Sequence, residues 1–155
     1  MLKKYFIFLL LGFSWVLFAL PTVMAETNTA MGSKDVTVHK SPYWGCCKGW
    51  SSHLEKAGFK VTSIHSEDLD SIKEKYKIKP ELQSCHTALI DGYIIEGHVP
   101  VEDIQRLLKE RPKNIAGLAT PGMPMGSPGM EGGRVDKYKV YSFDKKGTVR
   151  IFSKH

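Results

Sequence analysis

The sequence predicts an α/β domain whose elements follow the order β-α-β-α-β-β-α. Residues 36–39 alternate between apolar and polar side chains, as a short strand does, and Trp50 and Leu54 then share one helical face that ends at Gly58. The Asp-Gly pair at residues 91–92 lies between two apolar runs, which is typical of a β-hairpin. Helical connections favour parallel pairing of the first two strands, and the hairpin adds an antiparallel pair. This order is the thioredoxin-like pattern.

The remaining elements follow from the same periodicities. Residues 61–64 predict a second strand, and apolar residues at helical spacing predict a second helix before Pro80. A third helix is expected over residues 100–111. Residues 113–135 are rich in methionine, glycine and proline, so we expect an irregular loop there. Residues 136–155 contain two apolar runs around a turn and predict a C-terminal β-hairpin packed on the domain.

The N-terminus has the pattern of a signal peptide. Lys3 and Lys4 precede an apolar run over residues 5–20, which is shorter than the roughly 20 residues of a membrane-spanning helix. Small residues favour cleavage after Ala25, so the mature chain is expected to begin at Glu26, in the periplasm and not embedded in the membrane. The alternative is an uncleaved membrane anchor.

These patterns divide the chain into five parts. They are a signal peptide (1–25), a flexible leader (26–34), a thioredoxin-like domain (35–112), a Met/Gly/Pro-rich loop (113–135) and a C-terminal hairpin (136–155). Cleavage lowers the formal charge from +6 to +4 by removing two lysines. So modest an excess of positive charge does not indicate a nucleic-acid partner.

The cysteine content argues against a disulfide scaffold. The chain has three cysteines, Cys46, Cys47 and Cys85, and an odd number leaves at least one thiol unpaired in an oxidising compartment. The adjacent Cys46 and Cys47 can pair with each other only by straining the peptide between them. Either a metal protects these thiols, or they take part in redox exchange.

The predicted fold brings the three cysteines together. Cys46 and Cys47 lie at the start of the first helix, whose N-terminus lowers a thiol pKa and so favours the metal-binding thiolate. Cys47 shares the apolar face of that helix and is expected to be the more buried of the two. In this fold the turn before the third strand lies against the helix start and normally carries a cis-proline. Here that turn holds Cys85 and His86 instead, which favours metal ligation over disulfide exchange.

A second soft-donor signal lies in the irregular loop. Met123, Met125 and Met130 are spaced by glycine and proline, and thioethers select Cu(I) over harder ions. The alternatives are a surface loop whose methionines only pack, and a Zn(II) site that uses the cysteines and histidine alone. His39 and His98 are not expected as ligands, since we place His98 on the far side of the hairpin.

Several short motifs together identify a family resemblance: Lys40-Ser41-Pro42, Gly45-Cys46-Cys47, Ser84-Cys85-His86-Thr87-Ala88, Gly97-His98-Val99-Pro100, and the run from Gly122 through Met130 to Gly132. Through them residues 36–133 resemble the domain-of-unknown-function 411 family of predicted metal-binding proteins. The resemblance implies a bacterial exported protein associated with copper resistance, with no established catalytic activity. The family usually has Cys-Gly-Cys-Cys, and here Trp44 replaces the first cysteine. The C-x-x-C pair is therefore missing. His86 or a methionine would supply the missing fourth ligand, or the metal would be bound by three ligands only.

Two functions of different classes follow. The first is a periplasmic protein that binds Cu(I) at Cys46, Cys47, Cys85 and His86 for sequestration, transfer or resistance, with a copper exporter or another periplasmic copper protein as candidate partner. The second is a thiol-disulfide oxidoreductase that uses Cys46 or Cys47 with Cys85. A third possibility is an interaction module that binds a partner through the Met-rich loop.

Overall fold

The computed structural model describes residues 33–43 and 45–155. The expected signal peptide, its cleavage site, most of the leader and Trp44 lie outside the described residues. Within the described part of the chain, no helix combines the length and the apolar character needed to cross a membrane.

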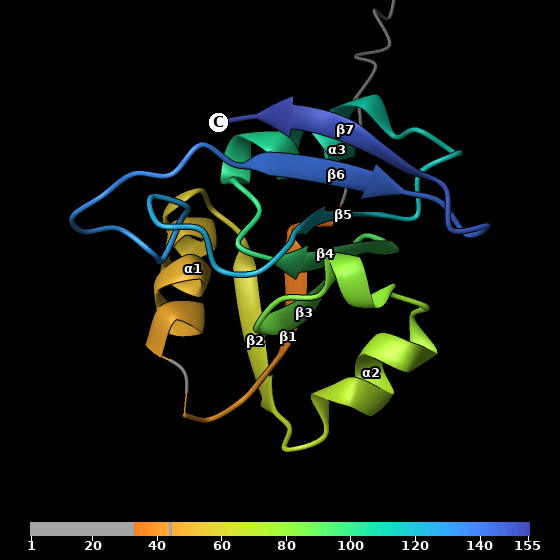
Figure 1. Ribbon diagram of the computed structural model, residues 1–155. Coiled ribbons are helices and arrows are strands. Elements are labelled where there is room, and N and C mark those ends of the chain that lie inside the picture. The colour runs from red at the N-terminus through yellow and green to blue at the C-terminus, as the bar shows by residue number, and fades with distance from the viewer. Residues whose placement is uncertain (1–32, 44) are drawn as a thin grey trace, which may run out of the picture.

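A single mixed sheet of seven strands forms the centre of the molecule, in the order β2-β1-β3-β4-β5-β6-β7 (Figure 1). The strands are β1 (Asp35–Lys40), β2 (Lys60–His65), β3 (His86–Ile90), β4 (Tyr93–Gly97), β5 (Gly117–Thr120), β6 (Lys139–Phe143) and β7 (Val149–Lys154). β1 pairs in parallel with β2 and antiparallel with β3, and β3 forms an antiparallel hairpin with β4. β4 then pairs in parallel with β5.

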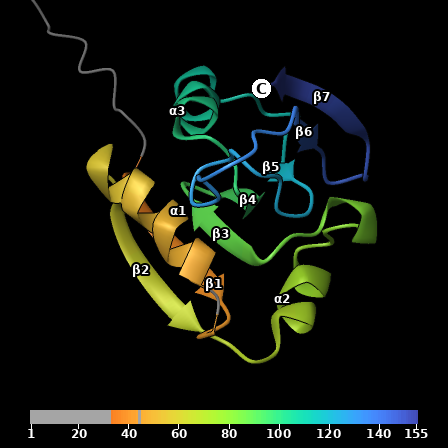
Figure 2. The same cartoon turned by 60° about the vertical axis from the view of Figure 1, so that its left-hand side comes forward.

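The helices cover both faces of this sheet. They are α1 (Gly45–Lys56), α2 (Leu69–Lys75) and α3 (Val101–Glu110), with a short 3₁₀ turn at Pro80–Leu82. α1 and α3 contribute to the larger apolar cluster, whereas the residues that follow α2 pack into a smaller cluster on the opposite face. Figure 2 shows α1 lying along β1 and β2, and α2 standing apart from it.

The expected α/β fold class and the element order up to α3 are confirmed. Two differences concern the C-terminal third. Residues 117–120, expected within an irregular loop, form strand β5. All four residues are buried, and their backbone pairs with β4 on one side and β6 on the other. The expected C-terminal hairpin is present as β6 and β7, but it extends the same sheet instead of packing on the domain.

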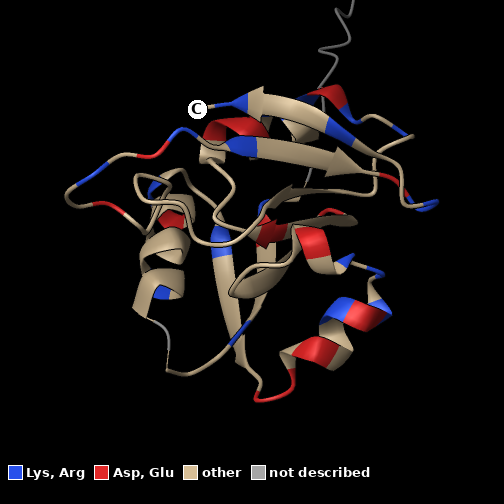
Figure 3. Cartoon of the chain, viewed as in Figure 1, with Lys and Arg blue, Asp and Glu red and all other residues tan. Residues whose placement is uncertain are grey.

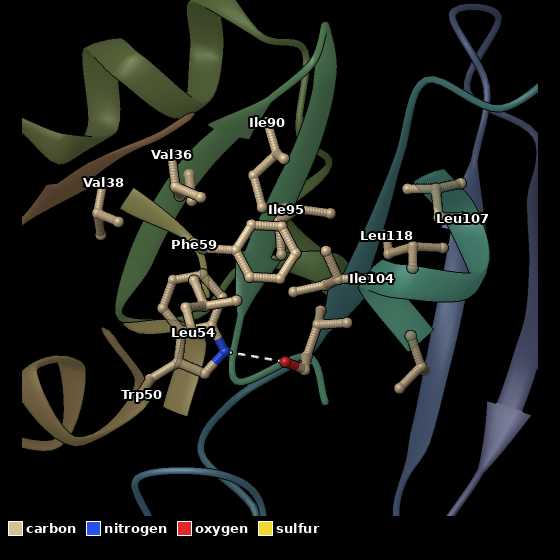
Figure 4. Close-up of a cluster of buried hydrophobic side chains, with 13 residues drawn as sticks. Val36, Val38, Trp50, Leu54, Phe59, Ile90, Ile95, Ile104, Leu107 and Leu118 are labelled. Carbon is tan, nitrogen blue, oxygen red and sulfur yellow. Dashed lines mark hydrogen bonds between the residues drawn. The ribbon is translucent and has the colours of Figure 1, made fainter. Parts of the chain in front are cut away.

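The larger core fixes α1 against the β3–β4 hairpin. Trp50 and Leu54 from α1 meet Val36 and Val38 from β1, and all four side chains are almost fully buried. The Trp50 indole Nε1 donates a hydrogen bond of 2.9 Å to the Val99 carbonyl, just beyond the end of β4 (Figure 4). The middle of α1 and the segment just after β4 are thereby held together.

Candidate metal centre

Five sulfur and imidazole side chains converge where α1 begins. Cys46 and Cys47 lie in the first turn of α1. Cys85 immediately precedes β3, His86 begins it, and His98 follows the end of β4. Two groups of three have their donor atoms mutually within 4.8 Å. One is Cys46, Cys85 and His98, and the other is Cys47, Cys85 and His86. Cys85 belongs to both groups and is the centre of the cluster.

The distances within the cluster are short. The Cys47 and Cys85 sulfurs are 3.3 Å apart, and the Cys46 sulfur is 4.0 Å from that of Cys47. The Cys85 sulfur lies 3.1 Å from His86 Nδ1 and 2.9 Å from His98 Nε2. Cys47, Cys85 and both imidazoles are buried, and Cys46 is partly exposed. Cys46 therefore faces the side from which solvent reaches the cluster.

The buried thiols differ strongly in acidity. A hydrogen bond from Cys85 lowers the pKa of Cys47 to about 4, with His86 acting in the same direction. That bond and burial raise the pKa of Cys85, and burial raises the pKa of Cys46. The cluster thus favours a thiolate at Cys47 that accepts a hydrogen bond from the Cys85 thiol, which keeps its proton. The sequence suggested the helix N-terminus as the cause of a low thiol pKa, and in the structure the largest cause for Cys47 is the hydrogen bond from Cys85.

The two imidazoles are held neutral and oriented for ligation. Burial lowers the pKa of both His86 and His98, which keeps a nitrogen lone pair available to a metal. His98 Nδ1 lies 2.8 Å from the Pro128 carbonyl, so Nδ1 carries the hydrogen and the Nε2 lone pair faces Cys85. His86 Nε2 is buried and has no hydrogen-bond partner among the described residues.

The placement of His98 overturns the expectation that it lies away from the site. The β3–β4 register pairs Ile90 with Tyr93, so the end of β4 returns to the start of β3. Gly97 has φ +71°, a left-handed conformation that breaks the strand alternation. A Cβ at Gly97 would lie 2.4 Å from the Ser84 side chain, so only glycine allows this close approach. The motif Gly97-His98 was one signal that could have revealed the position of His98 beside Cys85.

His39 does not join the cluster. Its strand neighbours Val38 and Lys40 are buried, and Val38 packs in the larger core. Strand alternation therefore places His39 on the other face, where Lys75 of α2 contributes to a lowered pKa that is caused mainly by burial.

The Met-rich loop closes over the cluster, but its methionines play different parts. The Met123 sulfur lies 4.0 Å from the Cys46 sulfur. Met125 and Met130 take part in backbone bonds within the loop: the Met125 carbonyl accepts from Asp136, and the Met130 carbonyl accepts from Gly126. Met123 is the loop thioether that the structure brings to the cysteines.

The loop is fastened to α1 by close backbone packing. A Cβ at Gly129 would lie 2.6 Å from both the Cys46 carbonyl and the Trp50 nitrogen, so the loop backbone rests directly on the helix. Beside this contact Glu131 accepts from the Gly129 backbone and lies 2.5 Å from His53 Nε2. The loop is thus part of the site's wall.

A buried ion pair supports the turn that carries Cys85. Lys73 Nζ donates to a Glu96 carboxylate oxygen at 2.5 Å, and both side chains are buried on the sheet face opposite the cluster. Glu96 also accepts from the Thr87 hydroxyl and from the Ser84 backbone N–H at 2.7 Å. Burial raises the pKa of Glu96, while Lys73 acts against that shift. The carboxylate thereby anchors the residue before Cys85.

The donor set has the chemistry of a soft-metal site. Three cysteine sulfurs, two neutral imidazoles and one thioether surround a small volume, and such donors suit Cu(I) or Zn(II) rather than hard ions. His86 Nδ1 faces the Cys85 sulfur at 3.1 Å, so this nitrogen is placed to act as a ligand. The residues present therefore fit a soft metal ion.

Comparisons with known proteins agree with this chemistry. The family described as "Protein of unknown function, DUF411" matches residues 82–130. Form 2 of a solved copper resistance protein, copG, is 41% identical over 78% of this chain and 97% of its own length, with a TM-score of 0.74. For Form 1 the values are 40% identity, 80% and 98% coverage, and a TM-score of 0.75. No match was found among curated proteins. The chain belongs to the DUF411 family and shares the fold of the copper resistance protein copG.

Proposed function

We propose that this protein binds Cu(I) in the periplasm and serves copper sequestration, transfer or resistance. The observation that carries the proposal is Cys85, whose sulfur lies at the centre of two groups of cysteine and histidine donors. The thiolate favoured at Cys47, the nearby Met123 thioether and the two neutral imidazoles make a donor set that is softer than zinc requires. The similarity to a copper resistance protein supports copper as the cargo.

Metal analysis of the native protein tests this proposal. The full chain is expressed with its own N-terminus, purified from the periplasmic fraction under reducing conditions, and titrated with Cu(I) against a chromogenic chelator. We expect tight stoichiometric Cu(I) binding, displacement of bound Zn(II) by Cu(I), and a mature N-terminus at Glu26. Retention of Zn(II) in the presence of Cu(I) would contradict copper as the cargo, and recovery only in the membrane fraction would contradict the periplasmic location.

The close approach of Cys47 and Cys85 favours a thiol-disulfide oxidoreductase as the second candidate. Their sulfurs are 3.3 Å apart, and the low pKa of Cys47, about 4, suits a nucleophilic thiolate. An insulin-reduction assay with dithiothreitol separates the two functions. Catalysed reduction without Cu(I) binding would favour the oxidoreductase, whereas Cu(I) binding without catalysis is the result we expect.

Met123 is expected to govern the rate of Cu(I) transfer. Met123→Leu keeps the apolar volume but removes the thioether beside Cys46, so stability should change little. Tight affinity should stay near that of the parent protein, because thiolates are the stronger ligands, while stopped-flow transfer from the chelator should slow. The double variant Met125→Leu/Met130→Leu is the matched control and should transfer at the parent rate. Equal Cu(I) transfer rates for all three proteins would show that the loop methionines only pack and take no part in transfer.

A further inference from the structure

A basic pocket lies at the end of the β3–β4 hairpin that points away from the cysteine cluster. It has a volume of about 860 Å³ and lies where the end of α2, the α3–β5 connection and the β6–β7 turn meet. Figure 3 shows lysine and arginine at the end of α2 and at the β6–β7 turn. The cations that line it are exposed: Lys75, Lys77, Lys79, Arg111, Lys113, Lys145 and Lys146.

The two carboxylates of the pocket are already engaged. Asp91 pairs with Arg111. Asp144 accepts hydrogen bonds from the backbone N–H groups of Lys146 and Thr148, which hold its own turn together. Seven cations against two acids leave the lining with a formal charge of +5. An anionic ligand would therefore meet little competition from the pocket's own carboxylates.

The positive charge of the described chain is concentrated in this pocket. Away from it, the described residues carry thirteen lysine and arginine side chains and thirteen acidic ones, so the rest of the described surface balances to zero. Like charges placed close together raise the free energy of the folded state, and so concentrated a patch is typical of a surface that binds an anion.

The floor of the pocket is apolar. Tyr93, Ile94 and Phe143 lie between the three charged segments, with Tyr76 and Ile115 beside them. An acidic peptide can place an apolar side chain on this floor and its carboxylates on the cationic rim. A flat membrane surface cannot follow a concave pocket, and a small oxyanion would leave the apolar floor exposed.

We propose that this pocket docks an acidic, apolar-containing segment of a partner polypeptide. β3 and β4 each run for five residues between the cysteine cluster and this pocket, which separates them by roughly 17 Å. A partner held here would leave the exposed side of the cysteine cluster free. The docking surface does not depend on which metal the cluster binds.

A peptide-binding measurement tests the proposal. The probe is a short fluorescein-labelled peptide of alternating Glu and Phe, followed by anisotropy. The variant Lys113→Glu/Lys145→Glu/Lys146→Glu changes three exposed loop residues and is expected to weaken binding at least about tenfold. The matched control Lys56→Glu/Lys60→Glu/Lys139→Glu changes the net charge equally, at exposed positions outside the pocket, and should bind like the parent protein.

Three results would overturn the docking surface. Equal loss of binding in both triple variants would show non-specific charge attraction. Equal binding of a Glu/Ser peptide would show that the apolar floor is not used. Binding of vesicles that contain anionic phosphatidylglycerol, lost in the pocket variant, without binding of the Glu/Phe peptide, would assign the pocket to a lipid surface instead.

Discussion

Cys85→Ser is expected to lower Cu(I) affinity by at least about 100-fold, since removing even a group that only orients a metal ligand costs roughly 10- to 100-fold. Cys85 is the one cysteine shared by both groups of donors, so its loss breaks each of them. Cys46 belongs to one group and is partly exposed, so Cys46→Ser should cost less. Competition titration with a Cu(I) chelator measures all of these affinities.

Two controls separate a lost ligand from a misfolded protein. Cys85→Ala avoids burying a new hydroxyl and should lose affinity to the same extent as Cys85→Ser. Ser63→Ala, on the exposed strand β2, should leave both folding and affinity unchanged. Parent-like Cu(I) affinity in a folded Cys85→Ala protein would show that the convergent cluster is not the binding site.

Glu96→Gln should give the largest loss of stability, about 3–5 kcal/mol in the free energy of unfolding, because it leaves the Lys73 ammonium buried without a carboxylate. The amide keeps the shape of the side chain and can still accept from the Ser84 backbone, so the variant isolates the effect of charge. Urea unfolding followed by circular dichroism measures the change. A loss below about 1 kcal/mol, the range of an exposed pair, would mean that the buried pair contributes little.

A double variant and a surface pair complete this test. Lys73→Met/Glu96→Gln removes both charges and should be closer in stability to the parent protein than Glu96→Gln alone. Asp136→Asn breaks the more exposed pair with Arg134 and should cost no more than about 1 kcal/mol. A double variant as unstable as Glu96→Gln would mean that lost hydrogen bonds, and not an unpaired charge, dominate.

The sequence was sufficient to predict the central elements because their signals are local. The Asp-Gly turn, the apolar face of α1 and the strand alternation of β1 each depend on neighbouring residues. Strand β5 was missed because Gly117–Thr120 has little strand propensity of its own, and β4 and β6 on either side of it supply its pairing. A pattern of neighbouring residues in the sequence does not contain this information about which strands lie on either side.

The position of His98, by contrast, was predicted wrongly although the predicted hairpin contained the information needed to place it. A two-residue turn at Asp91 and Gly92 pairs residues that lie equally far from it, and Cys85 and His98 are each six positions away. Extending the hairpin register would have placed them opposite each other. The buried Lys73–Glu96 pair could not be found in this way, because its residues come from α2 and β4 and nothing in the sequence links them.

The separation of the donors along the chain has a consequence for how the protein matures. The sulfur of Cys46 meets that of Met123 across 77 positions, and Cys47 meets Cys85 across 38, so both contacts need the finished sheet. The apolar core beside these contacts consists of residues that do not bind metals, such as Trp50 and Leu54, and they pack on one another and on the strands. We therefore expect the apolar core to fold first and the proposed metal ion to enter a site that is already assembled.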